Sequence, residues 1–529
     1  MKVLGINLSH NASFSIVEKG HLLFSLEQER ISKKKKDSEI NLLCSNLNGS
    51  HFPIIGYTSY DLTDEKLTYL TNKLKYDLTK ENITYDKLIP YDRHHLTHCY
   101  SSFYNSGFKD AICLIIDNGG TSYTLDGVSL GQELISIYKL SYDKEPELIY
   151  KLCINRFGKN FSMGKYHSYN CMSPAGIFQT YKHVLNLKEE GSIMGLSSYG
   201  KDNKEVTNIY DKSDLFCKIN INFNDFIIRR IRVPDEDFCY RIQKESTEIV
   251  KKYIDLIMKD YGNNICLSGG FFQNSVANYE FLKMNSNIFV DPVCHDGGTS
   301  IGLAHHLDYI INKNKPIKYA NLYQGPIYNN KNKLLNSNIL SEEKIKIIDC
   351  DNKKVAQLLK DNKCVGIYQG RSEMGPRALG NRSILFNPIN ANAKDKVNLV
   401  KKREWFRPYA GTVLFEHTKD WFNLEGKDET PFMSYVVDVN KNKINKIPGI
   451  CHVDNTCRIQ TLKKEHNKNF YEIIDEFYKI TGVPVILNTS LNQAGKPLIE
   501  SIENCFDMIL ESKIDFIYFP EYNQAIESV

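Results

Sequence analysis

Hydrophobic positions at the start of the chain follow the short period of β-strands. Three apolar runs lie at residues 2–8, 12–18 and 21–28, and the turn residues Lys19 and Gly20 separate the last two. This pattern predicts three strands joined as a β-meander. The polar run at 33–37, which contains four consecutive lysines, is typical of a solvated loop.

Further along, apolar runs that read as buried strands alternate with helical patterns. In the first half we expect strands at 111–116, 264–267 and 288–290 and helices at 234–261 and 275–284. In the second half we expect helices at 353–360, 470–480 and 502–512 and strands at 364–368, 484–487 and 515–519. This alternation predicts an α/β protein that binds ligands at the carboxyl edges of its sheets. A stretch rich in Asn, Lys and Ser at about 312–347 predicts a linker between domains, and no internal repeat is visible.

Composition places the chain among ordinary soluble globular proteins. It has 529 residues, of which 42% are hydrophobic and 25% are charged, and this length predicts two to four domains. The net charge of +4 argues against a protein that coats nucleic acid or membrane. The first residues lack the apolar core of a signal peptide and no run is long enough to span a bilayer, so we expect a cytoplasmic protein without a membrane partner. The 14 cysteines form no C-x-x-C pair, which predicts reduced and mostly buried thiols.

Two histidines one helical turn apart are the first candidates for chemistry. His94 and His98 share a face if their segment is helical. The residue after His94 is His95, so the H-E-x-x-H zinc motif is absent, and the pair alone also fits polar histidines on a partly exposed helix. However, Asp117 ends one predicted strand and Asp296 follows another, so both carboxylates can reach the same sheet edge. The set predicts a divalent first-row metal, iron, manganese or zinc, that acts as a Lewis acid.

Two glycine turns each join a predicted strand to a helix. They contain Gly269 and Gly270, followed by Asn274, and Gly297 and Gly298. Backbone amides at such turns can face phosphate or ribose oxygens, although glycines there also serve close packing.

Basic residues gather in the second half, just after the strand predicted at 364–368. Arg371, Arg377 and Arg382 lie in one glycine-bearing segment, and guanidinium groups bind phosphate or carboxylate well. Further basic and polar candidates follow at Lys402, Arg403, Arg407, His452, Arg458, Asn488, Ser490 and Asn492. Four such segments in one domain predict a pocket for a polyanion, such as a nucleotide with a second phosphate.

Together these motifs resemble the O-carbamoyltransferases of the nodulation, cephamycin and aminoglycoside type. The resemblance covers nearly the whole chain, and its specific strings are GPRALGNRS at 375–383 and NTSLN at 488–492. The chain departs from the family pattern at four places, which are Asn11 after His10, Gln28 with Lys33–Lys35, Asn118 between Asp117 and Gly119, and Lys496. The first two lie where the acceptor or carbamoyl group would bind, so the resemblance does not give the acceptor.

The resemblance implies two domains and a two-step reaction. Residues 1–335 would form a metal-dependent transfer domain of the sugar-kinase/actin-like ATPase fold, related to the tRNA threonylcarbamoyl transferases, and residues 345–529 a YrdC-like α/β domain. In the second domain, carbamate from carbamoyl phosphate would attack the α-phosphate of ATP to give carbamoyl-adenylate and pyrophosphate. In the first, the carbamoyl group would pass to an acceptor hydroxyl beside a metal ion.

The resemblance also assigns roles to the candidate residues. The metal would be Fe(II), with Mn or Zn as alternatives, and Mg would accompany ATP. Its ligands fall on His94, His98, Asp117 and Asp296. The residues implied in catalysis are His10, Arg371, Arg377, Arg382, Lys402 and Arg403. The remaining candidates named above would bind the nucleotide or carbamoyl phosphate.

We therefore expect an ATP-dependent O-carbamoyltransferase acting on a hydroxyl of a small molecule or modified nucleotide. One alternative is a tRNA threonylcarbamoyladenosine-type transferase, which would use a similar first domain but take its adenylate from a separate protein. Another is a non-catalytic nucleotide-binding regulator. No obligatory protein partner is expected, and the sequence does not distinguish a monomer from a homodimer.

Overall fold

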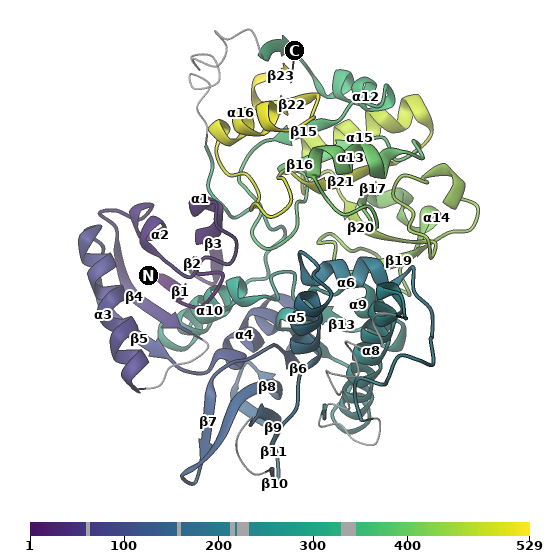
Figure 1. Cartoon of the computed structure of the whole chain (residues 1–529). Coiled ribbons are helices and arrows are strands. Elements are labelled where there is room, and N and C mark those ends of the chain that lie inside the picture. Colours follow the sequence, from purple (N-terminus) through teal and green to yellow (C-terminus); the bar gives the residue numbers. More distant parts are fainter. Residues whose placement is uncertain (60–63, 156–159, 212–216, 219–231, 329–344, 529) are drawn as a thin grey trace. The chain divides into compact units, whose positions relative to one another are not determined.

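The computed structural model describes residues 1–59, 64–155, 160–211, 217–218, 232–328 and 345–528 (Figure 1). The chain divides into two compact units. The first contains residues 1–28 and 36–319, and the second contains residues 29–35 and 320–529. The predicted domain limit at 335 lies outside the described residues. The short segment 29–35 was expected in the first domain but belongs to the second unit.

The first unit opens with a five-stranded sheet in the order β3-β2-β1-β4-β5. Its strands are β1 (Lys2–Asn7), β2 (Ser13–Glu18), β3 (His21–Glu27), β4 (His51–Thr58) and β5 (Thr84–Tyr91). Strands β1, β2 and β3 are antiparallel neighbours, as the predicted meander requires, and β4 and β5 continue parallel to β1. The accompanying helices are α1 (Gln28–Ser32), α2 (Asn41–Ser45) and α3 (Asp64–Lys80). The lysine run after α1 is an exposed loop, which confirms that prediction.

The second sheet of this unit repeats the first in topology. Its central order is β9-β8-β6-β12-β13, with β6, β8 and β9 antiparallel and β12 and β13 parallel to β6. The strands are β6 (Asp110–Ile116), β8 (Val128–Ser141), β9 (Lys144–Ile154), β12 (Ile265–Ser268) and β13 (Ile288–Val290). Smaller strands extend it, namely β7 (Ser122–Leu125), β10 (Phe161–Met163) and β11 (Tyr166–Tyr169). The sequence shows no repeat because many different apolar residues satisfy the same strand pattern.

Two helices pack against each other and carry the site. α4 (His94–Ser106) follows the first sheet but lies against β6, β8 and β12 of the second, and α10 (Thr299–Asn312) follows the second sheet but lies against β1, β2 and β4 of the first. Gly302 permits this contact, because a Cβ there would lie 2.1 Å from the Thr97 carbonyl oxygen of α4. The other helices in the described part of the unit are α5 (Pro174–Val184), α6 (Glu190–Ser197), α8 (Asp235–Asp260) and α9 (Ser275–Met284).

The second unit is built on a mixed ten-stranded sheet in the order β14-β23-β22-β15-β16-β21-β17-β20-β19-β18. Its strands are β14 (Ile345–Asp349), β15 (Val365–Tyr368), β16 (Arg382–Phe386), β17 (Ala410–Leu414), β18 (Phe422–Asn423), β19 (Val436–Val439), β20 (Thr456–Leu462), β21 (Val485–Ser490), β22 (Phe516–Phe519) and β23 (Gln524–Ser528). Its helices are α12 (Asn352–Lys360), α13 (Ala393–Lys401), α14 (Thr418–Trp421), α15 (Lys468–Thr481) and α16 (Ile502–Glu511). Every helix and strand predicted in this half is present within a few residues.

The last three residues of the predicted linker belong to a strand. Residues 345–347 begin β14, which pairs with β23, because Ile345 and Ile347 alternate with polar residues in a strand pattern too short to stand out. Residues 329–344 of the predicted linker lie outside the described part of the chain.

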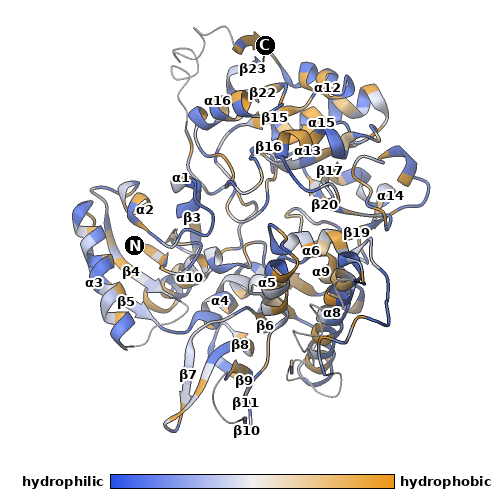
Figure 2. Cartoon of the chain, in the orientation of Figure 1, coloured by the Kyte–Doolittle hydropathy of each residue, from blue (hydrophilic) through white to orange (hydrophobic). Residues whose placement is uncertain are grey.

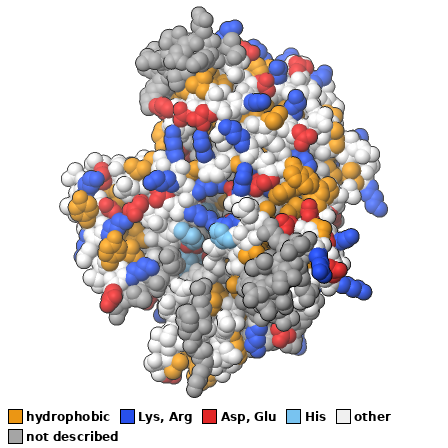
Figure 3. All heavy atoms as spheres, viewed as in Figure 1, with side chains coloured by type: hydrophobic (Ala, Val, Ile, Leu, Met, Phe, Trp, Pro, Cys, Tyr) orange, Lys and Arg blue, Asp and Glu red, His pale blue; other side chains and the backbone are white. Residues whose placement is uncertain are grey.

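Both units have the cores and surfaces that the composition predicts. Hydrophobic and hydrophilic residues alternate along helices such as α3 and α8 (Figure 2), and all cysteines are free, with every one buried except the half-buried Cys451. On the face drawn in Figure 3, basic and acidic side chains are interspersed. Among the described residues, no helix is long and apolar enough to cross a membrane.

Candidate functional site

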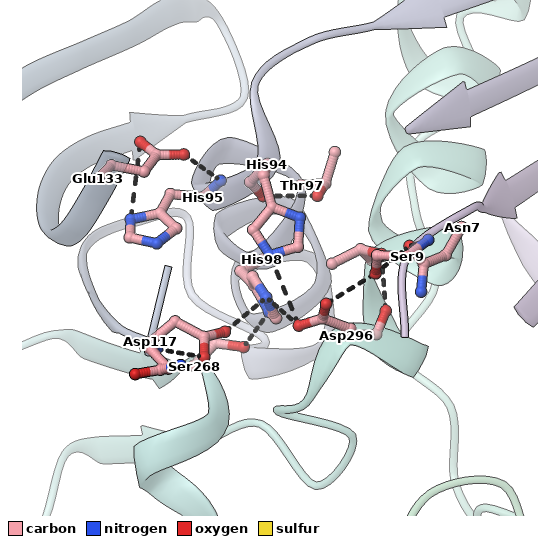
Figure 4. A network of polar contacts seen from close by, with 12 residues as sticks. Asn7, Ser9, His94, His95, Thr97, His98, Asp117, Glu133, Ser268 and Asp296 are labelled. Carbon is pink, nitrogen blue, oxygen red and sulfur yellow. Dashed lines mark hydrogen bonds and ion pairs between the residues drawn. The ribbon is translucent and has the colours of Figure 1, made fainter. Parts of the chain in front are cut away.

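The four predicted metal ligands meet in the first unit. His94 and His98 lie on the first turns of α4, Asp117 directly follows β6, and Asp296 opens the short turn before α10. One ligand atom from each residue lies within 4.8 Å of those of the other three, and all four side chains are buried. Figure 4 shows both imidazoles pointing toward the two carboxylates. The local spacing of the histidines and the strand-end positions of the aspartates thus converge as expected.

The distances in this cluster suit a shared cation better than direct hydrogen bonds. Asp296 Oδ1 lies 3.5 Å from His94 Nε2 and 3.6 Å from His98 Nε2, and Asp117 Oδ2 lies 3.5 Å from His98 Nε2. The two Nε2 atoms and Asp117 Oδ2 are buried and have no hydrogen-bond partner. Such atoms are rare in proteins, and a cation bound at about 2.0–2.2 Å from each would satisfy all of them. The residues present therefore fit a divalent metal ion.

The electrostatics of the cluster also favour a cation. Burial alone would lower the pKa of His98, but Asp117 and Asp296 outweigh it and raise that pKa to about 9. Burial would raise the pKa values of the two carboxyl groups, yet the neighbouring imidazoles hold both below their ordinary range. Two ionised carboxylates in a buried site provide the negative charge that a divalent ion needs.

Further side chains orient these ligands. Ser9 Oγ donates to Asp296 Oδ2 at 2.7 Å, and His10 Nδ1 lies 2.8 Å from the same oxygen. The Asp296 carboxylate raises the pKa of His10 to about 9. Ser268 Oγ lies 3.3 Å from His98 Nδ1 and donates to Asp291. Outer contacts of this kind fix the rings and carboxylates of metal ligands.

Only His10 of these outer residues was predicted. Ser9 could have been found from its place beside His10, and Asp291 from its place directly after β13. Ser268 directly follows the strand predicted at 264–267 and could have been found by the same signal.

A fully buried charged network holds the start of α4. Glu133 Oε1 accepts hydrogen bonds from the backbone N–H groups of His95 and Thr121, both at 3.1 Å, and Glu133 Oε2 pairs with the Lys151 ammonium. Thr121 Oγ1 in turn accepts from the His94 N–H at 3.0 Å. Figure 4 shows that His95 points away from the cluster toward Glu133. No local pattern in the sequence marks Glu133 or Lys151.

The predicted glycine turns lie beside the metal cluster. Close packing against neighbouring backbone explains why glycine occupies these positions. Gly269 has φ of +99°, and a Cβ there would lie 2.4 Å from the Ile116 carbonyl oxygen. A Cβ on Gly298 would lie 2.0 Å from the Val293 carbonyl oxygen. Asn274 caps α9 and donates to Gln243. A nucleotide contact for Gly269, Gly270, Asn274, Gly297 and Gly298 stays a prediction.

In the second unit, four of the predicted basic residues form one cluster. The Arg458 side chain is half-buried, and its Nε atom is buried without a hydrogen-bond partner. Burial, followed by the charges of Arg377, Arg403 and Arg407, holds the pKa of Arg458 well below its usual range. Guanidinium groups gathered around a half-buried one repel each other, so an anion at this position would offset part of that repulsion. A contact of Arg377, Arg403, Arg407 and Arg458 with an anion stays a prediction.

Two other predicted arginines are engaged by the backbone. Arg371 donates from Nε to Gly325 O and from Nη2 to Gln324 O, both at 2.7 Å. Arg382 is fully buried, donates to the carbonyl oxygens of residues 369, 370 and 381, and stacks on Tyr368 with Cζ 3.8 Å from the ring centre. These contacts shape the loop between β15 and β16, and a direct contact of either arginine with phosphate stays a prediction.

The same loop depends on two residues that the sequence did not single out. Glu373 Oε1 accepts hydrogen bonds from the N–H groups of Leu379 and Asn381 at 2.7 and 2.8 Å. Arg30, from the short segment 29–35, donates to the carbonyl oxygens of Glu373 and Gly375 at 3.3 and 2.7 Å. The arginine-bearing loop is thus held by a residue 345 positions earlier in the chain.

Lys401, which was not among the candidates, binds two of the predicted residues, and a contact of Lys402 with phosphate stays a prediction. The Lys401 ammonium is buried and donates to Ser490 O, Ser490 Oγ and Asn492 Oδ1 at 2.6, 2.9 and 2.6 Å, whereas the Lys402 side chain is exposed and its backbone ends α13 with φ of +53°. The predicted residues Ser490 and Asn492 are therefore brought together by Lys401.

The remaining two candidates lie on other strands and loops. Asn488 is buried and donates to Thr412 Oγ1 at 3.0 Å. His452 Nδ1 lies 3.6 Å from Asp454 Oδ1.

Comparison with known families gives a clear result. The family model described as "Carbamoyltransferase N-terminus" matches residues 48–305, and the one described as "Carbamoyltransferase C-terminus" matches residues 356–524. The two matches together span most of the chain, one in each compact unit.

Individual relatives agree with the family models. An uncharacterized protein of Methanocaldococcus jannaschii is 30% identical, with 98% of this chain and 99% of the relative aligned. Nodulation protein NolNO of Sinorhizobium fredii is 27% identical over 97% of this chain and 78% of its own length. Among solved structures, the activator of 2-hydroxyisocaproyl-CoA dehydratase from Clostridium difficile covers 60% of this chain and 99% of its own, with 13% identity and a TM-score of 0.36. On the two family models and the full-length relatives, the chain belongs to the carbamoyltransferase family.

Proposed function

We propose that the protein is an ATP-dependent O-carbamoyltransferase that divides its reaction between the two units. The second unit makes carbamoyl-adenylate from carbamoyl phosphate and ATP, and the first unit transfers the carbamoyl group to an acceptor hydroxyl. The observation that supports this proposal is a cluster of arginines in one unit and a buried histidine–carboxylate cluster that could hold a metal in the other, because the two steps need these two different environments.

In the second unit, the arginine cluster around Arg458 supports the activation step. Carbamate formed from carbamoyl phosphate attacks the α-phosphate of ATP, the bond to the β-phosphate oxygen breaks, and pyrophosphate leaves. Negative charge builds up on phosphate oxygens during this step, and preorganised guanidinium groups stabilise such charge. Lys401, the last residue of α13, is held by Ser490 and Asn492 and adds a fixed ammonium to the second unit. We assign a YrdC-like fold to this unit as part of the proposal.

In the first unit, the buried histidine and carboxylate cluster supports the transfer step. His94, His98, Asp117 and Asp296 would hold a divalent ion, Fe(II), Mn or Zn, which would polarise the carbamoyl carbonyl as a Lewis acid. Ser9 and His10 contact Asp296 and so fix the position of that carboxylate. The repeated sheet topology supports an actin-like ATPase fold for this unit, and Mg would accompany ATP. The protein needs no protein partner for this chemistry.

Pyrophosphate formation tests the proposal directly. The full-length protein should release pyrophosphate only when ATP and carbamoyl phosphate are both present. Arg377→Ala should lower this rate on the order of 100-fold or more, because water does not replace guanidinium contacts to developing phosphate charge. Arg232→Ala, which removes an exposed arginine of the first unit, is the matched control and should retain the rate. A near-native rate in Arg377→Ala would place activation elsewhere.

A further inference from the structure

A buried arginine near the start of the chain takes part in no reaction step described so far. Arg30 lies in α1, and the segment 29–35 that contains it belongs to the second unit. Its side chain is buried, with 6% of the residue exposed. The family resemblance places this stretch of sequence where the acceptor or carbamoyl group would bind. The contacts of Arg30 in the second unit point to a different role.

Arg30 holds the backbone of the loop between β15 and β16 just before Arg377. Its Nη2 donates to the Gly375 carbonyl oxygen at 2.7 Å and to the Glu373 carbonyl oxygen at 3.3 Å. Gly375 has φ of +82°, a left-handed conformation that glycine adopts readily. Pro376 follows, and Arg377 is the next residue. Charge-assisted bonds to the two carbonyl groups therefore fix the turn from which the chain enters Arg377.

The far side of the same loop is fixed as well, so that Arg30 completes a frame around Arg377. The carboxylate of Glu373 accepts hydrogen bonds from two backbone N–H groups at 2.7 and 2.8 Å. The Asn488 side chain donates to the Ala378 carbonyl oxygen at 3.3 Å. Because backbone anchors lie on both sides of Arg377, its backbone has few positions available.

Electrostatic repulsion explains why Arg377 needs such a frame. The pKa of Arg458 is held well below its usual range by burial and then by the charges of Arg377, Arg403 and Arg407. Like charges that lower a pKa in this way also repel each other. The repulsion favours any movement of the loop that takes Arg377 away from the other guanidinium groups, and the bonds from Arg30 oppose that movement.

We propose that Arg30 is a positioning residue for the activation step, which holds Arg377 where its guanidinium group meets the phosphate groups of the substrates. The assignment rests on the proposed function. Without Arg30, Arg377 occupies this position for only part of the time. Apparent substrate affinity then falls by the fraction of competent molecules, whereas the rate with saturating substrate is retained, because binding selects the competent form.

Steady-state release of pyrophosphate by full-length Arg30→Ala separates affinity from rate. For ATP or carbamoyl phosphate, we expect the half-saturating concentration to rise about tenfold, while the saturated rate stays within about twofold of wild type. Arg377→Ala, by contrast, should lose the saturated rate. Arg232→Ala removes an exposed arginine and should keep both quantities. A loss of saturated rate in Arg30→Ala with unchanged half-saturating concentrations would overturn the proposal.

A double variant shows whether Arg30 acts through Arg377. At fixed substrate concentrations, adding Arg30→Ala to Arg377→Ala should change pyrophosphate release by less than about twofold, since the group that Arg30 positions is already absent. A general structural role predicts instead that the losses of the two single variants multiply. Multiplication of the two losses would therefore overturn the proposal.

Binding of inorganic pyrophosphate, measured by calorimetry on the full-length protein, tests the positioning without any chemistry. Arg30→Ala should weaken this binding about tenfold, and Arg30→Lys, which keeps the charge but loses the guanidinium fork, about threefold. Circular dichroism checks that each variant is folded, and Arg30→Lys carries the test if Arg30→Ala does not fold. Native affinity in Arg30→Lys together with Arg30→Ala, or in Arg30→Lys alone where the other is unfolded, would overturn the proposal.

The wild-type protein separates this proposal from the proposed function. If it releases no pyrophosphate from ATP and carbamoyl phosphate, the proposed function fails, and the assignment of Arg30 to the activation step fails with it. If it does release pyrophosphate but Arg30→Ala has native half-saturating concentrations for both substrates, only the role of Arg30 fails.

Discussion

Replacing Lys151 should destabilise the first unit strongly, because it would leave a carboxylate buried without its cation. Lys151 and Glu133 are 0% and 1% exposed. Burial would raise the pKa of Glu133, but His95 and Lys151 hold it at about 2, so the carboxylate is ionised at neutral pH. In Lys151→Met the charge remains buried, and breaking a buried pair in this way costs about 3–5 kcal/mol. This is a large part of a typical stability of about 5–15 kcal/mol.

The double variant separates the effect of charge from the effect of packing. Glu133→Gln with Lys151→Met removes both charges, while the new carboxamide would still offer an oxygen to the N–H groups of His95 and Thr121. It should therefore be more stable than Lys151→Met alone. Lys419→Met is the matched control, since Lys419 and Asp428 form a pair at 2.8 Å in which both side chains are 75% exposed. That change should cost less than about 1 kcal/mol.

Hydrogen exchange of the full-length protein is the suitable measurement, because two units need not unfold in one step. The amides of His95 and Thr121 report on the network, and both should lose protection in Lys151→Met. Since α4 begins at His94, metal affinity should also fall about tenfold or more. Two results would refute the reasoning, namely a loss below about 1 kcal/mol in Lys151→Met, or a double variant no more stable than the single one.

Three further predictions follow from the site and its surroundings. His98→Ala should lose bound metal, measured by elemental analysis, and carbamoyl transfer, while pyrophosphate release continues; unchanged metal content would remove His98 from the ligand set. A chain cut within residues 312–347 should yield a C-terminal fragment that lacks Arg30 and its hydrogen bonds to Glu373 and Gly375. Fragments mixed at micromolar concentration should therefore carbamoylate little acceptor, and hydrolysis of the free adenylate in solution should lower the yield further. Full transfer by fragments that do not associate would contradict this prediction. Burial lowers the pKa of His305 to about 4. As the pH falls from about 6.5 to 4, the unfolded chain therefore binds a proton at this residue before the folded protein does, and the free energy of unfolding drops by up to about 3 kcal/mol. His305→Leu should flatten this pH dependence of stability in urea titrations, and an unchanged slope would count against the prediction.

The sequence by itself determined the local structure and most of the chemical groups. Short apolar runs predicted β1, β2, β3 and the strand–helix series of both halves, because period and capping act over a few residues. The spacing of His94 and His98 gave two ligands on one helical face, and strand ends gave Asp117 and Asp296. The strings around Arg377 and Ser490 carried the family resemblance that the family models confirm.

The sequence failed where a role depends on residues far apart in the chain. Lys401 was not predicted beside Lys402, because the sequence does not show which of two adjacent lysines is buried against Ser490. Segment 29–35 was placed with its sequence neighbours, although Arg30 holds a loop of the second unit. The buried ion pair of Glu133 and Lys151 could not be predicted, because the pattern of a strand does not show which charged residue on another strand will pair with it.

Only the tertiary structure decided which of these groups meet. Ser9 and Asp296, separated by 287 positions, come within 2.7 Å because α10 packs on the first sheet. Local periodicity is set by the nearest turns of the chain, whereas burial and paired charges are set by which surfaces pack together, and that information is spread over the whole sequence.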